Sequence, residues 1–103
     1  MTSVLERLEA LSRPERFEAL ELIVVSEFRA ALLMTEDEEL PLDDSFFELG
    51  LTSLGLVDVK QRLETMLGRG IDSTVLFNSP TVEQLMDRLT TDILADLFEG
   101  GRP

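Results

Sequence analysis

Residues 45–64 read SFFELGLTSLGLVDVKQRLE, and this stretch joins a polar approach to an amphipathic helix. The approach carries two adjacent aromatic residues, Phe46 and Phe47, and a glycine, Gly50. The helix is predicted to begin at Thr52 or Ser53, because Ser and Thr are preferred where a helix starts. The Ser53 hydroxyl therefore lies at the junction of a loop and a helix.

The predicted helix from Ser53 to about Leu67 carries two apolar surfaces. Its main stripe repeats at helical spacing and is expected to face the core; it consists of Leu56, Val59, Leu63, Met66 and Leu67. Leu54 and Val57 lie off this stripe, with Asp58 and Gln61 nearby. The second patch is either buried against another element or partly exposed to dock a partner, with Asp58 as a charged rim. The residues leave both interpretations open.

The composition suits one acidic domain with one core. The chain has 103 residues and a net charge of −12, with 21 acidic residues against 9 basic ones. Such a surface repels nucleic acid and anionic membranes, so we expect neither as a partner, and proteins with basic patches are the expected partners. Hydrophobic residues make up 44% of the chain, which is too apolar for a disordered acidic tail.

The residue types argue against an enzyme. The chain has no cysteine and no histidine, so it lacks a disulfide, a thiol nucleophile and the commonest general base. Asp37 and Glu48 have the spacing of a calcium loop's ends, but Pro41 and Leu42 occupy positions that need a ligand and a glycine. We therefore predict a non-catalytic protein without a metal site.

No export or membrane signal is recognisable. No apolar run in the first third of the chain, Leu22–Val25 included, approaches the length of a membrane span. The first residues lack a basic region followed by an apolar one. A cytoplasmic protein, present as a monomer, is the expectation.

The whole chain is predicted to be all-α: a small four-helix bundle of three long helices and one short one, with an extra short N-terminal helix. No segment alternates at period two for long enough to indicate a strand. Capping-box spacings at Ser3 with Glu6, Ser12 with Glu15 and Thr81 with Gln84 indicate three helix starts. The expected helices are 4–11, 13–33, 53–67, a single turn at 72–77, and 81–98.

The helix expected over 13–33 has a broad apolar face, which suggests a central position. Its main stripe consists of Phe17, Leu20, Val24, Phe28 and Ala31, and Leu22, Ile23 and Val25 widen it.

The connection over 35–51 holds seven acidic residues and no basic one. Five of its apolar side chains are expected to fold back onto the core: Leu40, Leu42, Phe46, Phe47 and Leu49.

Ser53 admits two interpretations. Taken alone, a serine at a helix start is usually a cap that accepts a hydrogen bond from a first-turn amide. A helix N-terminus also offers unpaired N–H groups and partial positive charge, which favour a phosphate. A phosphodiester on Ser53 would therefore suit its position.

Two segments resemble the acyl carrier domains that bind phosphopantetheine. FFELGLTSLGLVDVKQRLE is similar to the attachment region of this family, and LFNSPTVEQLMDRL is similar to its last loop and helix. The likeness extends over roughly Phe17 to Leu89. Three short segments resemble polyketide synthase carriers more than peptidyl carriers: Gly50-Leu51, Val57-Asp58-Val59 and Arg62-Leu63-Glu64. Peptidyl carriers tend to have two glycines where this chain has Gly50-Leu51.

The resemblance implies a carrier whose Ser53 receives 4′-phosphopantetheine from coenzyme A. A separate phosphopantetheinyl transferase using Mg²⁺ would attach it, and the terminal thiol would then hold acyl or polyketide intermediates as thioesters. Partners would include that transferase, a ketosynthase, an acyltransferase and other synthase domains. The partner-contact positions implied are Thr52, Leu54, Val57, Asp58 and Gln61.

The sequence departs from the family at Thr52, where the family usually has Asp. The alternative therefore stays open that the chain is an unmodified helical adaptor on the same fold. The resemblance divides the chain into an N-terminal helix, linker or docking element over 1–12, a carrier domain over 13–99 and a flexible tail over 100–103.

Overall fold

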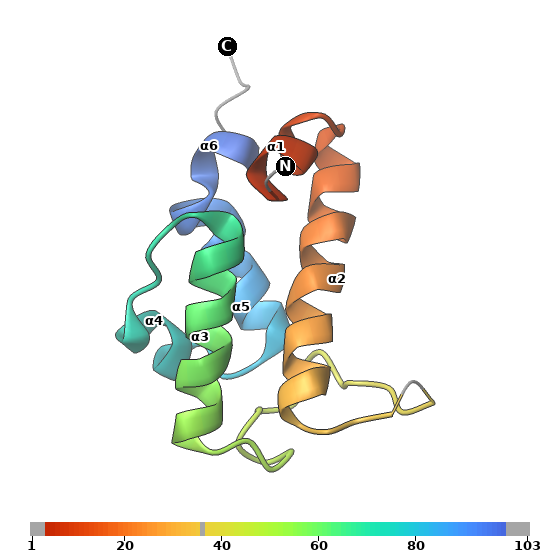
Figure 1. The fold of residues 1–103 in the computed structure, drawn as a ribbon, viewed down its shortest axis with the longest axis vertical. Helices are drawn as coiled ribbons and strands as arrows, with labels where there is room; N and C mark the ends of the chain where they lie inside the picture. The colour runs from red at the N-terminus through yellow and green to blue at the C-terminus, as the bar shows by residue number, and fades with distance from the viewer. Residues whose placement is uncertain (1–3, 36, 99–103) are drawn as a thin grey trace.

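The computed structural model describes residues 4–35 and 37–98, and this part of the chain contains helices and no strand. Figure 1 shows their order. The elements are α1 (Val4–Glu9), α2 (Arg13–Ala31), α3 (Ser53–Leu67), α4 (Ser73–Asn78), α5 (Val82–Arg88), the π-helix η1 (Leu89–Ile93) and α6 (Ala95–Phe98).

The prediction of a small all-α bundle is confirmed. Helix α2 packs against both α3 and α5, and the short helix α4 lies against α3 and α5. Helices α1 and α6 lie at one end of the bundle, whereas the long connection and the start of α3 lie at the other end (Figure 1). Within the described part of the chain, no helix is long and apolar enough to cross a membrane.

The core is built mainly from the apolar stripes of the long helices. Leu20, Val24 and Phe28 of α2 are buried in it. From α3 come Leu56, Val59, Leu63 and Leu67, as predicted, and Met66 is partly buried. Burial of each large side chain contributes about 1.5–3 kcal/mol, so these stripes hold the helices together.

The apolar face predicted for α2 is wider than the face that the structure buries. Phe17 is 41% exposed and Leu22 is 69% exposed, and Ala31 also lies at the surface. Ile23 and Val25 pack against the core, as predicted, so the prediction is wrong only for the positions farthest from the Leu20–Val24–Phe28 stripe. Its start matches the prediction, since the Glu15 carboxylate accepts hydrogen bonds from the N–H and hydroxyl of Ser12.

Helix α2 ends at Ala31, two residues before the predicted end. Leu33 then adopts φ +58° and is 88% exposed. This left-handed conformation is rare for a residue with a large side chain. It turns the chain into the connection that leads to α3.

The last predicted helix is not continuous. It divides into α5, η1 and α6, and the wider turns of η1 occur at Thr90 and Thr91. The hydroxyls of these threonines donate to the carbonyl oxygens of Met86 and Asp87. Hydroxyl groups that bond back to a helical carbonyl compete with the regular backbone ladder. The Thr81 cap is present, with its oxygen accepting from the Gln84 N–H.

Helix α1 is fastened to the rest of the fold. Leu8 is buried in the common core. The guanidinium of Arg16 donates to the carbonyl oxygens of Glu9, Leu11 and Leu97, at 2.9, 2.9 and 2.6 Å. The expected capping box of Ser3 and Glu6 lies partly outside the described residues.

The connection between α2 and α3 is held by its backbone and by one aromatic ring. The Phe46 ring stacks on Phe28 with centroids 3.8 Å apart, and Leu40 is also buried. The Phe46 N–H donates to the Pro80 carbonyl at 2.7 Å.

Not all the apolar residues of this connection reach the core. Leu40 and Phe46 are buried and Leu49 packs against the core, but Leu42 and Phe47 are each 38% exposed. The prediction is therefore wrong for Leu42 and Phe47. Phe47 follows the buried Phe46 directly in an irregular segment. Adjacent side chains in such a segment rarely point in the same direction, so Phe47 does not enter the core beside Phe46.

Candidate functional site

Ser53 is the first residue of α3, and its side chain is exposed. Thr52 is the cap, with its Oγ1 accepting a hydrogen bond from the Gly55 N–H at 3.0 Å. The sequence left the cap to either residue, and the structure assigns it to Thr52. The Ser53 hydroxyl makes no hydrogen bond to any described residue.

The loop that presents Ser53 has a defined shape. Gly50 has φ +107°, which favours glycine over every other residue. The next N–H, that of Leu51, donates to the Phe46 carbonyl at 2.9 Å, and the Leu51 side chain is buried. Because Phe46 is itself stacked on α2, the approach to Ser53 is anchored to the core.

Gly55 permits a close contact beneath the start of α3. A Cβ at this position would come within 2.9 Å of the Leu51 Cδ1 and 3.4 Å of the Thr52 Oγ1. The glycine therefore lets the loop side chains lie flat against the first turn.

The outer side of α3 presents a continuous stripe. Leu54 is 83% exposed and Val57 is 37% exposed, and Asp58 and Gln61 are also exposed. Their spacing of i, i+3, i+4 and i+7 places them on one face of the helix. Of the two interpretations of Leu54 and Val57, the structure favours exposure. We call these four residues the outer α3 stripe.

A groove of about 560 Å³ runs beside this stripe, between α3 and α2. Asp58, Gln61, Arg62 and Glu27 contribute to its lining. One Glu27 carboxylate oxygen, Oε1, is buried without a hydrogen bond, and Arg62 Nη1 lies 3.9 Å from it. The groove therefore extends the polar part of the stripe toward α2.

Sequence reasoning missed one aromatic pair near the site. Phe47, in the loop before α3, stacks against Phe77 of α4 with centroids 6.1 Å apart and planes within 11°. Phe77 is 43% exposed. The contact depends on how the loop lies beside α4, which periodicity along the chain does not reveal.

The start of α3 can accommodate a phosphate. The helix has 15 residues and no acidic residue in its first turn. Thr52 satisfies one first-turn N–H, and the remaining amides give a partial positive charge where an anion is stabilised. Over residues 4–35 and 37–98, no group of three or more carboxylates is placed to hold a metal ion.

This geometry describes a helical module in which the exposed Ser53 hydroxyl lies beside an exposed helix face. Residues 24–89 match the family model described as "Phosphopantetheine attachment site". The chain belongs to this family, and it is a carrier domain that tethers intermediates on covalent 4′-phosphopantetheine.

Relatives of the chain include large polyketide synthases. The chain is 30% identical over 102 residues to polyketide synthase GfsA of Streptomyces halstedii, covering 99% of this chain and 1% of that protein. It is 29% identical over 102 residues to the phenolphthiocerol synthesis polyketide synthase type I Pks15/1 of Mycobacterium bovis, covering 99% of this chain and 5% of that protein. It thus spans a small part of each relative, and it is a carrier domain of the polyketide synthase type.

Solved carrier structures share the fold. One, described as "A1-type ACP domain from module 5 of MLSA1", superimposes with a TM-score of 0.73 at 26% identity, covering 89% of this chain and 92% of that one. BlmI, a type-II acyl carrier protein from Streptomyces verticillus, has a TM-score of 0.67 at 20% identity, covering 76% and 90%. The second likeness concerns the fold alone.

Proposed function

We propose that Ser53 is the attachment point of 4′-phosphopantetheine and that the outer α3 stripe docks the enzymes that act on the arm. One observation carries this proposal: at the first residue of α3, the Ser53 hydroxyl is exposed and makes no hydrogen bond within the described part of the chain. The neighbouring Thr52 hydroxyl is engaged by the Gly55 N–H, so it competes poorly as the reacting group. The family membership supports the chemistry.

The attachment is a phosphoryl transfer. The Ser53 Oγ attacks the phosphorus of coenzyme A that bears pantetheine, and a P–O bond forms. The pyrophosphate P–O bond breaks, adenosine 3′,5′-bisphosphate leaves, and the hydroxyl proton passes to a base of the transferase. A separate phosphopantetheinyl transferase with Mg²⁺ provides the activation, and the chain itself is non-catalytic. Once bound, the cofactor supplies a thiol that holds acyl groups as thioesters.

The intermediates are acyl or polyketide chains, as the relatives' names suggest. Ketosynthase, acyltransferase and other synthase domains would approach along the outer α3 stripe. Leu54 and Val57 supply apolar contact there, and Asp58 and Gln61 supply the polar rim. An acidic carrier docks quickly and reversibly on basic enzyme surfaces. We also propose 13–99 as the carrier domain and 1–12 as an N-terminal helix, linker or docking element.

Intact mass spectrometry tests the attachment. The chain is incubated with coenzyme A, Mg²⁺ and a broad-specificity phosphopantetheinyl transferase. We expect one phosphopantetheine increment in the wild type and none in Ser53→Ala. Thr52→Ala is the matched control and retains the increment. An increment that persists in Ser53→Ala would place the arm elsewhere, and no increment beside a modified control carrier would favour the unmodified adaptor.

A second experiment tests the docking face. Asp58→Lys reverses one charge on an exposed side chain, so the melting temperature should change little. Thioester transfer from the loaded arm to a ketosynthase should slow by roughly tenfold, because a rim charge mainly sets the association rate. Unchanged transfer together with normal loading would remove Asp58 from the docking face.

A further inference from the structure

A second groove lies away from the outer α3 stripe, between α2, α5 and the connection that follows α2. Its volume is about 530 Å³. Phe17 of α2 and Leu42 of the connection line it and are 41% and 38% exposed, and the buried Met86 of α5 also contributes. Two large exposed apolar side chains at one groove mark a surface suited to contact with another protein.

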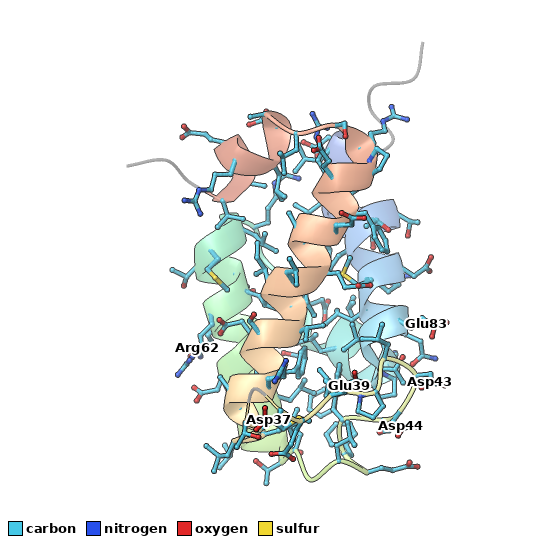
Figure 2. All side chains as sticks on the ribbon, turned by 90° about the vertical axis from the view of Figure 1, so that its right-hand side faces the viewer. Asp37, Glu39, Asp43, Asp44, Arg62 and Glu83 are labelled. Carbon is cyan, nitrogen blue, oxygen red and sulfur yellow. The ribbon has the colours of Figure 1, made fainter. Side chains whose placement is uncertain are left out.

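The backbone gives this groove a fixed wall. The Glu83 N–H, in the first turn of α5, donates to the Leu42 carbonyl at 3.0 Å. This bond holds the connection against α5 and brings Asp43 and Asp44 to the same side of the molecule as Glu83 (Figure 2). The groove's apolar and acidic residues are therefore positioned together by the fold.

The charges around the groove are not neutralised. Glu21, Glu83 and Asp87 line it. Their carboxylates, like those of Asp43 and Asp44, make no ion pair or hydrogen bond with any described residue.

Arg88 also lines the groove, but its guanidinium pairs with Asp92 at 3.1 Å. The local field is strongly negative as a result, and it favours a cationic partner.

We propose that this groove docks a basic amphipathic helix of a protein partner, with a short apolar stripe flanked by Lys and Arg. The apolar side chains would contact Phe17 and Leu42, and the cations would pair with Glu21, Glu83 and Asp87. A second copy of this chain is a poor occupant, because each copy has a net charge of −12. The groove volume is enough for a few side chains but not for a whole helix. The partner helix would therefore lie across the groove and insert only its apolar side chains.

The groove and the outer α3 stripe can be occupied together. In Figure 2, α2 faces the viewer with α3 on one side and α5 on the other, and Arg62 of α3 is on the side away from Glu83, Asp43 and Asp44. A partner could therefore hold the domain at the groove while an enzyme acts at Ser53. This proposal does not depend on modification of Ser53.

Solution NMR with a defined probe tests the groove. The probe is a synthetic helix of Leu, Lys and Ala with Leu at i, i+3, i+4 and i+7, titrated into the ¹⁵N-labelled full chain. A control peptide has the same composition with the Leu residues dispersed around the helix. We expect saturable shifts of the amides of Phe17, Leu42 and Asp87 with the amphipathic peptide, and at least tenfold weaker binding of the dispersed one.

Two matched charge reversals locate the binding. Asp87→Lys at the groove should weaken the peptide's affinity by roughly tenfold, whereas Asp58→Lys on α3 should leave it unchanged within about twofold. Phe17→Ala is an independent test, since the exposed ring can be removed while the melting temperature stays close to that of the wild type. It should weaken binding by roughly tenfold as well.

Three outcomes would overturn the proposal: shifts centred on α3, equal weakening by Asp87→Lys and Asp58→Lys, or equal binding of both peptides. Ser53 loading, measured on the groove variants Asp87→Lys and Phe17→Ala, stays normal in each case, so failure of the groove is distinguishable from failure of the carrier function.

Discussion

Gly50 and Thr52 together determine how Ser53 is presented. Gly50 turns the chain through φ +107°, and Thr52 closes the first turn of α3 with its side chain. Between them, Leu51 anchors the loop in the core. The Ser53 hydroxyl, the proposed attachment point, is thus positioned by its immediate neighbours.

Gly50→Ala should lower the free energy of unfolding by about 1–2 kcal/mol, because an L-residue pays that much for a left-handed backbone. Apart from its chain neighbours, no atom lies within 4 Å of the added Cβ, so the effect is conformational and not a clash with the rest of the fold. Urea denaturation measures it. Gly70→Ala is the matched control, since φ there is outside the left-handed range and the nearest atom is 3.8 Å away. Equal losses in both variants would contradict the backbone argument.

Thr52→Ala should lower the free energy of unfolding by about 1 kcal/mol, because the Gly55 N–H loses its acceptor. Thr52→Asp keeps an acceptor and adds negative charge at the helix N-terminus, so its stability should match the wild type or exceed it by a few tenths of a kcal/mol. Urea denaturation of both variants is the measurement. If Thr52→Asp were as unstable as Thr52→Ala, the capping bond would not be the cause.

Helix α3 is held by different contacts at its two ends. Its start is fixed by the loop, whereas its end is fixed by Glu64. That carboxylate accepts from the Ile71 N–H at 2.7 Å and from Lys60 Nζ at 3.2 Å. Gly68 ends the helix in a left-handed conformation with its N–H on the Glu64 carbonyl at 2.8 Å. Glu64 thus orients the chain toward α4.

The pKa of Glu64 is lowered from its ordinary 4.5, first by the Ile71 N–H and then by Lys60. A lowered folded-state pKa gives stability that is complete above 4.5 and lost as pH falls through the lowered value. Glu64→Gln should therefore be less stable than the wild type at neutral pH, with the difference shrinking as pH falls below 4.5. Urea denaturation across this range, with Glu18→Gln as the exposed control, measures it. A constant difference at every pH would contradict the linkage.

The elements also show what sequence patterns can and cannot predict. The core stripe of α3 was predictable because apolar residues at helical spacing must share a face, and its exposed Leu54 and Val57 are simply off that face. Phe17 and Leu22 were misplaced because the pattern does not reveal how much of α2 has a neighbour. The π-helix η1 depends on hydroxyl bonds to carbonyls, which apolar periodicity does not register.

The candidate site was predictable in part for the same reason. Ser53 and Thr52 stand at a recognisable helix start, so local preference located the junction. The sequence did not predict the Phe47–Phe77 pair or the groove at Phe17 and Leu42. Both depend on where the connection between α2 and α3 lies in the folded chain. That placement rests on backbone bonds between residues distant in sequence, such as Phe46 to Pro80.

The two ends of the bundle differ in the residues that they carry. The end with the start of α3 carries Ser53, the proposed attachment point, and α1 and α6 lie together at the other end (Figure 1). Arg16 is central to the end with α1 and α6. Its guanidinium bonds to the carbonyls of Glu9, Leu11 and Leu97, which joins α1, the turn after it and α6 to α2.

Arg16→Ala should lower the free energy of unfolding by about 1.5–3 kcal/mol, because helix-terminal carbonyls lose a charged donor. Hydrogen exchange should show faster exchange of α1 and α6, while the first turns of α3 and of α4 keep their protection. Arg13→Ala is the matched control, since Arg13 is exposed on the same helix and makes no hydrogen bond to a described residue. Ser53 loading should be normal in both variants, because the affected contacts lie at the opposite end of the bundle. Uniformly faster exchange over the whole chain would mean that Arg16 stabilises the fold globally and that the two ends are not separable.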